Sequence, residues 1–261
     1  MKYWKYVALA TLHSLPASAN PVPVRHIQGY VHGFVVLKDV DDKVLASGNL
    51  TQFFNGSRVT AKLTLNFRDG SLYEERSVYS QRNVFQLHSY KQVQKGPSFK
   101  TPQTVALDTS TGKVSIQYRD KDGREKSISE QLKLPSDLAN GIVATLLANA
   151  DPKVETVLSL LVATPKPRVV KLRVSSTEPD SFWVGGSGAK ATHYVAKIDL
   201  GGLTGVAAKV AGKPPPPVHI WIAAGNAPVF LKSEGPLFED GPIWRIEQAS
   251  PSWPKAAPPK P

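Results

Sequence analysis

Residues 59–67 read Val-Thr-Ala-Lys-Leu-Thr-Leu-Asn-Phe, and apolar and polar side chains alternate along this stretch without an exception. A period of two is typical of a β-strand with one buried face and one solvated face. The dipeptide Asp69-Gly70 follows after one residue. Such a dipeptide beside alternating residues favours a tight hairpin. The stretch therefore predicts an antiparallel hairpin.

The same two signals recur along the chain. Alternating stretches occupy residues 113–119 and 170–174, and turn dipeptides occupy positions 41–42, 55–56 and 122–123. Many short strands joined by such turns predict an antiparallel meander rather than a βαβ chain. The predicted fold class is therefore all-β, mainly antiparallel, as a curved sheet, half-barrel or barrel.

One segment has the pattern of a helix. Ser136 is placed to cap a helix over residues 137–149, and Asp137 suits the positive end of its dipole. The apolar residues of this segment fall on one helical face, which predicts packing against the sheet. They are Leu138, Ile142, Val143, Leu146 and Leu147. Residues 203–212 are compatible with a second short helix or with an irregular loop.

The turns also predict which residues face each other. With two-residue loops at 41–42, 55–56, 69–70 and 81–82, the opposed pairs trace a single apolar face across five strands. The small residues Ala46 and Gly48 lie between larger neighbours on it, which leaves room for curvature or a hollow. The predicted face comprises Val35, Leu37, Ala46, Gly48, Leu50, Ala61, Leu63, Leu65, Phe67, Leu72, Val78, Phe85 and Leu87.

The same register places two charged residues, Glu74 and Arg76, on the apolar face, where charges are costly unless paired or solvated. Three interpretations stay open: a structural ion pair, the polar floor of a wet cavity, or a bulge that shifts the register by one and turns both outward. The register also predicts that Glu75 points outward, opposite His88. The candidate ligand-binding residues are Glu74, Arg76, Leu63, Leu65, Leu72 and Val78.

The beginning of the chain resembles a secretory signal peptide. Lys2 and Lys5 precede an uncharged, mostly apolar run that is half as long as a spanning helix, and Ala17-Ser18-Ala19 has the small residues of a cleavage site. We expect residues 1–19 to be removed, a mature chain from Asn20, and export to the periplasm or the extracellular space. Residues 20–249 are predicted to form a single domain, and the Pro-rich residues 250–261 a disordered tail.

Charge and cysteine content narrow the set of partners. The chain carries 32 Lys and Arg against 21 Asp and Glu, with a net charge of +11, and it contains no cysteine. Basic proteins attract anionic partners, here anionic components of the cell envelope. The charges are spread along the chain, and no interleaving of basic and aromatic residues indicates a nucleic-acid groove. We expect no nucleic-acid partner and no transmembrane segment in the mature chain.

Motifs for catalysis, cofactors and metals are incomplete. The Gly-rich residues 185–192 lack both the Gly-Lys-Ser/Thr order of a phosphate loop and the final glycine of a nucleophile elbow. Residues 120–123 resemble a calcium loop, but Tyr118 and Ser129 occupy ligand positions. The histidines show no metal-binding spacing. The sequence therefore predicts no cofactor, no metal and no catalytic residue.

Four segments are similar to those of uncharacterised exported bacterial proteins. They are Lys95–Phe99 (KGPSF), Leu134–Asn140 (LPSDLAN), Ala163–Arg168 (ATPKPR) and Gly241–Glu247 (GPIWRIE). The order of parts also resembles periplasmic β proteins of unknown function and lipoprotein-carrier half-barrels. The resemblance implies a curved antiparallel sheet around a helix or an apolar ligand, and it assigns no binding or catalytic residue.

Three functions are compatible with these features. The first is non-enzymatic binding of an apolar or amphipathic, lipid-like envelope molecule in the curved sheet, for which an apolar cavity open to solvent is required. The second is a structural or interaction protein of the envelope, for which the core is solid. The third is a hydrolase of envelope polymers, for which a cleft must bring a serine or a carboxylate to a histidine.

Overall fold

The computed structural model of the chain describes residues 21–120, 122–163, 166–184, 186–199 and 215–250. The predicted signal peptide, the segment 203–212 and nearly all of the predicted tail lie outside the described residues. No helix in the described part of the chain is long and apolar enough to cross a membrane.

The described strands form one antiparallel sheet of 15 strands, which is curved and does not close. The N-terminal limb is a meander of β1 (Val31–Lys38), β2 (Val44–Asn55), β3 (Arg58–Phe67), β4 (Leu72–Gln81), β5 (Phe85–Lys95), β6 (Gln103–Asp108), β7 (Lys113–Arg119) and β8 (Glu125–Gln131). The C-terminal limb contains β9 (Thr156–Val162), β10 (Arg168–Ser176), β11 (Asp180–Val184), β12 (Ser187–Asp199), β13 (Val218–Ala223), β14 (Phe230–Pro236) and β15 (Ile243–Gln248). The predicted all-β, antiparallel fold class is confirmed.

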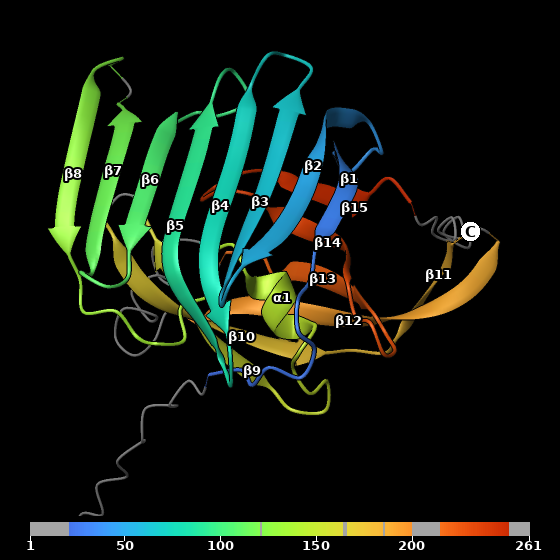
Figure 1. Cartoon of the computed structure of the whole chain (residues 1–261). Helices are drawn as coiled ribbons and strands as arrows, with labels where there is room; N and C mark the ends of the chain where they lie inside the picture. Colours follow the sequence, from blue (N-terminus) through green and yellow to red (C-terminus); the bar gives the residue numbers. More distant parts are fainter. Residues whose placement is uncertain (1–20, 121, 164–165, 185, 200–214, 251–261) are drawn as a thin grey trace, which may run out of the picture.

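The two limbs meet where β1 pairs with β15, and β8 and β9 are the opposite ends of the sheet. Strand β11 lies off this path and pairs only with β12 among the described strands. Because the sheet curls, the limbs face each other with α1 (Val143–Leu147) between them (Figure 1). The inner faces of both limbs are therefore available to form one interior.

Helix α1 is shorter than predicted. Ile142, not Ser136, precedes it, and no side chain caps it. Gly141 has a φ of +70°, a left-handed conformation that interrupts a helix. The residues before it instead bind the edge of β9: the Asn140 side chain accepts a hydrogen bond from the Leu161 N–H at 2.8 Å and donates one to the Leu161 carbonyl at 2.9 Å. Hydrogen bonds to the sheet therefore replace the predicted first two turns of the helix.

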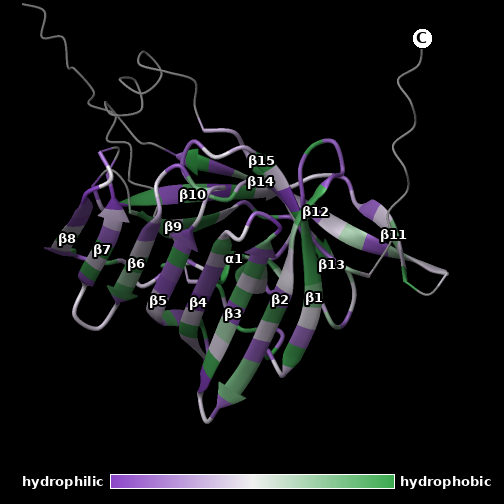
Figure 2. Ribbon diagram, turned by 90° about the horizontal axis from the view of Figure 1, so that it is seen from above, coloured by the Kyte–Doolittle hydropathy of each residue, from purple (hydrophilic) through white to green (hydrophobic). Residues whose placement is uncertain are grey.

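The described residues form two large apolar cores and a small third cluster of Phe182, Ala191, Trp221 and Leu231. The first lies between the limbs and α1, and it includes Tyr79, Leu87, Leu147, Leu172 and Ile222. The second lies near the junction of the limbs, where the ring centroids of Phe99 and Trp244 lie 5.4 to 6.4 Å from each other and from those of Phe67 and Phe238. Leu37 and Leu65 are fully buried in this core. Figure 2 shows the alternation of hydrophobic and hydrophilic residues along the strands that makes this arrangement possible.

The predicted registers are partly right. Strands β1 and β2 pair as predicted, with Val35 opposite Gly48 and Leu37 opposite Ala46. Strands β2 and β3 pair two residues away from the predicted register, because the loop is Gly56-Ser57 rather than Asn55-Gly56. A shift of two residues keeps every side chain on its predicted face.

The β3–β4 register is wrong by one residue. The Phe67 N–H bonds to the Ser71 carbonyl at 2.9 Å, so the loop contains three residues, and Gly70 adopts a φ of +84°. A three-residue hairpin with a left-handed glycine is a common alternative to the two-residue turn. Leu65 therefore opposes Tyr73, and Leu63 opposes Glu75. The odd shift exchanges the two faces of β4.

The β4–β5 register also differs from the prediction. Gln81 opposes Phe85 across a three-residue loop, and a bulge between Val78 and Tyr79 then moves the pairing by one further residue. Phe85 and Leu87 are buried, as their predicted place on the apolar face requires. Val78 and Leu72, in contrast, lie on the outer face, because Tyr79 and Tyr73 take the inward positions beside them.

Gly48 is required where β2 and β3 approach closely. A Cβ atom added there would lie 1.7 Å from the Thr64 carbonyl oxygen, a backbone atom that cannot move aside alone. We expect Gly48→Ala to lower the free energy of unfolding by about 1–3 kcal/mol, the usual cost of overpacking. Urea unfolding measures this. Gly29→Ala is the matched control, because no atom lies within 4 Å of its added Cβ. Equal stability of the two variants would contradict the close approach.

Candidate functional site

The six residues predicted to line a binding face divide between the two faces of the sheet. Leu63 lines the large cavity described below, and Leu65 is fully buried in the second core. The other four lie on the outer face, because the β3–β4 loop is one residue longer than predicted, and neither cavity described below is lined by them. These four are Leu72, Glu74, Arg76 and Val78.

The predicted inward placement of Glu74 and Arg76 is therefore wrong. Glu74 Oε2 lies 2.7 Å from Lys62 Nζ, and both side chains are about one-third exposed. An exposed pair of this kind contributes little to stability. The predicted outward placement of Glu75 is also wrong: it lies on the inner face, opposite Gln92 of β5.

A cavity of about 700 Å³ lies between the limbs. Its wall is mainly apolar and combines side chains from β1–β3, α1, β9, β10, β12 and β13. Among them are Val35, Leu50, Ala61, Leu63, Val143, Ala144, Leu160, Val170, Leu172, Ala196, Ile198 and Ile220. As formed by the described residues, the cavity is open to solvent, so this part of the interior is not filled by side chains.

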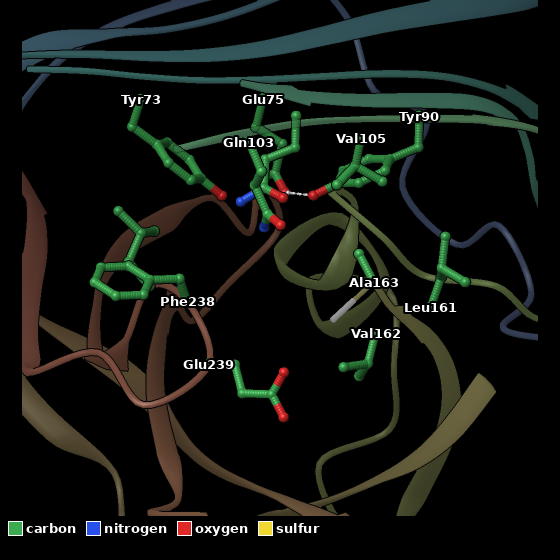
Figure 3. A pocket seen from close by; sticks show the side chains of 12 residues that line it. Tyr73, Glu75, Tyr90, Gln103, Val105, Leu161, Val162, Ala163, Phe238 and Glu239 are labelled. Atoms are coloured by element: carbon green, nitrogen blue, oxygen red, sulfur yellow. Dashed lines mark hydrogen bonds between the residues drawn. The ribbon is translucent and has the colours of Figure 1, made fainter. Parts of the chain in front are cut away.

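A smaller pocket of about 210 Å³ adjoins the large cavity. The residues that line both are Tyr73, Glu75, Val162, Leu237, Phe238 and Glu239. Here the inner face of the N-terminal limb becomes polar. Tyr73 and Glu75 come from β4, Tyr90 from β5 and Gln103 from β6 (Figure 3). Gln92 of β5 also lines this pocket. The combined space is therefore apolar over most of its wall and polar at one end.

Glu75 is the central group of this polar end. The Tyr90 hydroxyl donates a hydrogen bond to Glu75 Oε1 at 2.7 Å, drawn as a dashed line in Figure 3. Burial raises the pKa of the Glu75 carboxyl above its ordinary range, and the hydrogen bonds from Tyr90 and Tyr73 offset part of this rise. Burial, followed by the charge of Glu75, raises the pKa of both tyrosines, so they stay protonated donors.

Gln103 supplies a second acceptor. Its Oε1 is buried and accepts no hydrogen bond from the described residues. By contrast, the neighbouring amides are engaged: Gln92 donates to Gln94 at 3.2 Å, and Gln94 donates to the Thr101 carbonyl at 2.8 Å. A buried acceptor without a donor is costly, so this oxygen suits a ligand that brings a donor.

Sequence reasoning missed this polar end because it assigned the β4 residues to the wrong faces. A signal was nevertheless present on β5, where Tyr90, Gln92 and Gln94 recur every second residue. Three polar residues on one face of a strand match Tyr73 and Glu75 on one face of β4. Placing these polar residues of β4 and β5 on the same face of the sheet identifies which residues of β4 face the interior.

Two other clusters of polar side chains lie outside both cavities. Ser159 Oγ lies 2.9 Å from both Lys171 Nζ and an Asp137 oxygen, but Ser159 is fully buried and no substrate can reach it. On β12 and β13, His193 stacks on Trp221 with ring centroids 4.3 Å apart and lies 2.9 Å from a His219 nitrogen. No group of three or more metal-binding side chains is placed for an ion among the residues that the structure describes.

No protein-family profile and no curated protein sequence matches the chain. Among solved structures, the chain is similar to a β-barrel-like protein of the domain of unknown function DUF1849 from Brucella abortus. The identity is 11%, the alignment covers 89% of this chain and 98% of that one, and the TM-score is 0.41.

The raised pKa of Glu75 predicts the effect of Glu75→Gln on stability. Because the folded state holds the carboxyl proton more tightly than the unfolded chain does, ionisation destabilises the fold as the pH rises above the unfolded pKa. Glutamine cannot ionise and keeps an acceptor for Tyr90. We expect Glu75→Gln to be more stable than the parent at neutral pH, by about 1.4 kcal/mol for each unit of the pKa rise.

Urea unfolding at several pH values checks this expectation, and the two proteins should converge below about pH 4. Glu74→Gln is the matched control on the outer face, and it should give no gain at neutral pH. A Glu75→Gln variant that is less stable than the parent at neutral pH would contradict the assignment.

Proposed function

We propose that this protein binds an apolar or amphipathic molecule, with the apolar part in the 700 Å³ cavity and the polar part near Glu75. The observation that carries the proposal is the cavity itself. Its volume lies within the range of roughly 300–1,000 Å³ that is usual for small-molecule sites, and its mainly apolar wall has a few polar groups at one end. Each methylene group buried there contributes about 0.8 kcal/mol to binding.

The proposed binding role fits an exported protein. The pattern of residues 1–19 supports export, and an apolar molecule outside the cytoplasm has to cross an aqueous space. A cavity between the limbs shields such a molecule from water. We therefore place the protein in the periplasm or the extracellular space as part of the proposal.

The two alternative functions have less support. A purely structural protein needs no 700 Å³ cavity, and a void of that size weakens packing. For a hydrolase, the described part of the chain brings Ser159 to Lys171, where the hydroxyl is buried. It also brings Asp180 to within 3.8 Å of His193, but neither of these residues lines either cavity. Non-enzymatic binding is the function that uses the features of the interior.

Ala61→Trp tests the cavity. Ala61 lines the cavity from β3, so an indole there fills the space that the ligand needs. We expect the uncharged probe N-phenyl-1-naphthylamine to gain fluorescence with the parent and to bind the variant at least about tenfold more weakly. Thr60→Trp, on the outer face of the same strand, is the matched control and should bind like the parent. Unchanged binding by Ala61→Trp, or no binding by the parent, would contradict the proposal.

A second role, docking on an anionic lipid surface, is favoured by one end of the N-terminal limb. The basic-aromatic end consists of Tyr30, Phe53, Phe54, Arg58 and Arg82. The pairing of Val31 with Gln52, of Arg58 with Ser80, and the bond from Gln28 N to Gln81 bring their segments together. Tyr30, Phe53 and Phe54 are 76%, 47% and 59% exposed, and both arginines are exposed.

The charged side chains at this end are basic. Residues 43–68 and 76–107 contain no aspartate or glutamate, and the next acid, Asp108, is bound to Ser110 at 2.6 Å. Exposed aromatic rings beside arginines fit the interface of a bilayer with anionic headgroups. We propose this surface as the site where the protein meets its membrane.

Sedimentation with vesicles tests the docking role. We expect the parent to bind vesicles of phosphatidylglycerol and phosphatidylethanolamine more strongly than vesicles of phosphatidylcholine. The double variant Phe53→Ser, Phe54→Ser should lose at least about tenfold in vesicle affinity, because two aromatic side chains leave the lipid interface. Val40→Ser, which replaces a 70% exposed side chain in the β1–β2 turn, is the control. Equal binding by the double variant would contradict this role.

A further inference from the structure

The charged side chains that line the polar pocket are acidic, whereas the protein as a whole carries a net positive charge. The chain carries a net charge of +11, yet the 12 described residues that line this pocket include two carboxylates, Glu75 and Glu239, and no lysine, arginine or histidine. Glu75 projects from β4 and Glu239 from the loop between β14 and β15, on the opposite wall (Figure 3). An anionic headgroup would meet negative charge on both walls.

The hydrogen-bonding groups of the pocket also favour a positively charged ligand. Glu75 presents a carboxyl group, and Gln103 Oε1 is a buried acceptor without a partner among the described residues. A primary ammonium carries three donors and no acceptor, so it can satisfy both oxygens at once. The rings of Tyr73 and Phe238 also line the pocket, and aromatic faces attract cations.

We infer that the pocket binds the protonated amine headgroup of an amphipathic molecule whose carbon chain occupies the adjoining 700 Å³ cavity. This inference rests on the proposed binding function and specifies its ligand. Glu75 is the counter-charge and Gln103 is the second acceptor. A bare metal ion fits less well, because the described residues offer no group of three or more metal-binding side chains.

Among the charged groups around the pocket, Glu75 is the main counter-charge for the ammonium group. Glu239 Oε1 lies 3.5 Å from an Arg168 nitrogen, which compensates part of its charge. Tyr73 and Tyr90 stay neutral, and Lys62 and Asp240 line the large cavity rather than the pocket. Because the pKa of Glu75 is raised, protons compete with the ammonium at a higher pH than for an ordinary glutamate. Amine affinity should therefore fall as the pH falls through this pKa.

Three ligands with the same carbon chain test the inference: dodecylamine, dodecanol and dodecanoate, each measured by displacement of N-phenyl-1-naphthylamine at neutral pH. The parent should bind dodecylamine about tenfold or more tightly than dodecanol, as expected for a charged hydrogen bond, and dodecanoate should bind most weakly. In Glu75→Gln the ratio of amine to alcohol affinity should fall to about one. Glu74→Gln, on the outer face, should keep the parent ratio.

The outcomes separate this inference from the function on which it rests. If the parent binds the probe but shows no preference for the amine, or if Glu75→Gln keeps the preference, the headgroup assignment is wrong and the binding function stands. If the parent binds neither the probe nor any of the three ligands, the binding function itself fails, and the headgroup assignment fails with it. A preference for dodecanoate would also overturn the assignment.

Discussion

The interior of this protein depends on the pairing of β1 with β15. Residues 35–38 and 245–248 come from the two ends of the described chain, and their ladder joins two limbs that would otherwise be separate sheets. Ion pairs reinforce the junction on its outer face, where Lys38 and Arg245 both contact Glu247. On its inner face, Leu37 and Ile246 oppose each other within the second core. The limbs face each other because this ladder holds, and only facing limbs enclose a cavity.

The cavity persists because different groups hold its two sides. The first core packs α1 between the limbs, and the second core fills the region near the junction. Small residues, among them Ala61, Gly141, Ala144 and Ala196, line the cavity at positions where larger side chains would fill it. A cavity with an apolar wall forgoes dispersion contacts that a packed core would make. The chain therefore lacks dispersion contacts at the position where a bound ligand would supply them.

The sequence was sufficient to predict the fold class and most of the inner face, because alternation and turn dipeptides report on neighbours a few residues apart. Leu37, Leu50, Leu63 and Phe67 lie on the face that these signals predict. The candidate site was beyond their reach for a physical reason: Asp69-Gly70 is compatible with both a two-residue and a three-residue loop, and the choice between them exchanges Glu74 for Glu75. The C-terminal limb adds Glu239 and Phe238 to the pocket through pairings across some 200 residues, which no local pattern encodes. The short α1 has a similar origin, because Asn140 bonds to β9 rather than to its own turn.

Glu75 is the residue at which local and global requirements conflict. On the inner face Glu75 lies between Leu63 and Gln92, and burial there raises the pKa of its carboxyl and weakens the fold. A glutamine would keep the hydrogen bond from Tyr90 without that cost. Gln103 presents a second unfavourable group a short distance away, an acceptor without a donor among the described residues. These two groups lie on different strands and line one pocket. Neither has a positively charged donor among the described residues. Local rules of stability fail most often where a protein binds or reacts. The proposed cationic headgroup would resolve the conflict at Glu75, because it would supply the charged donor that the described residues do not.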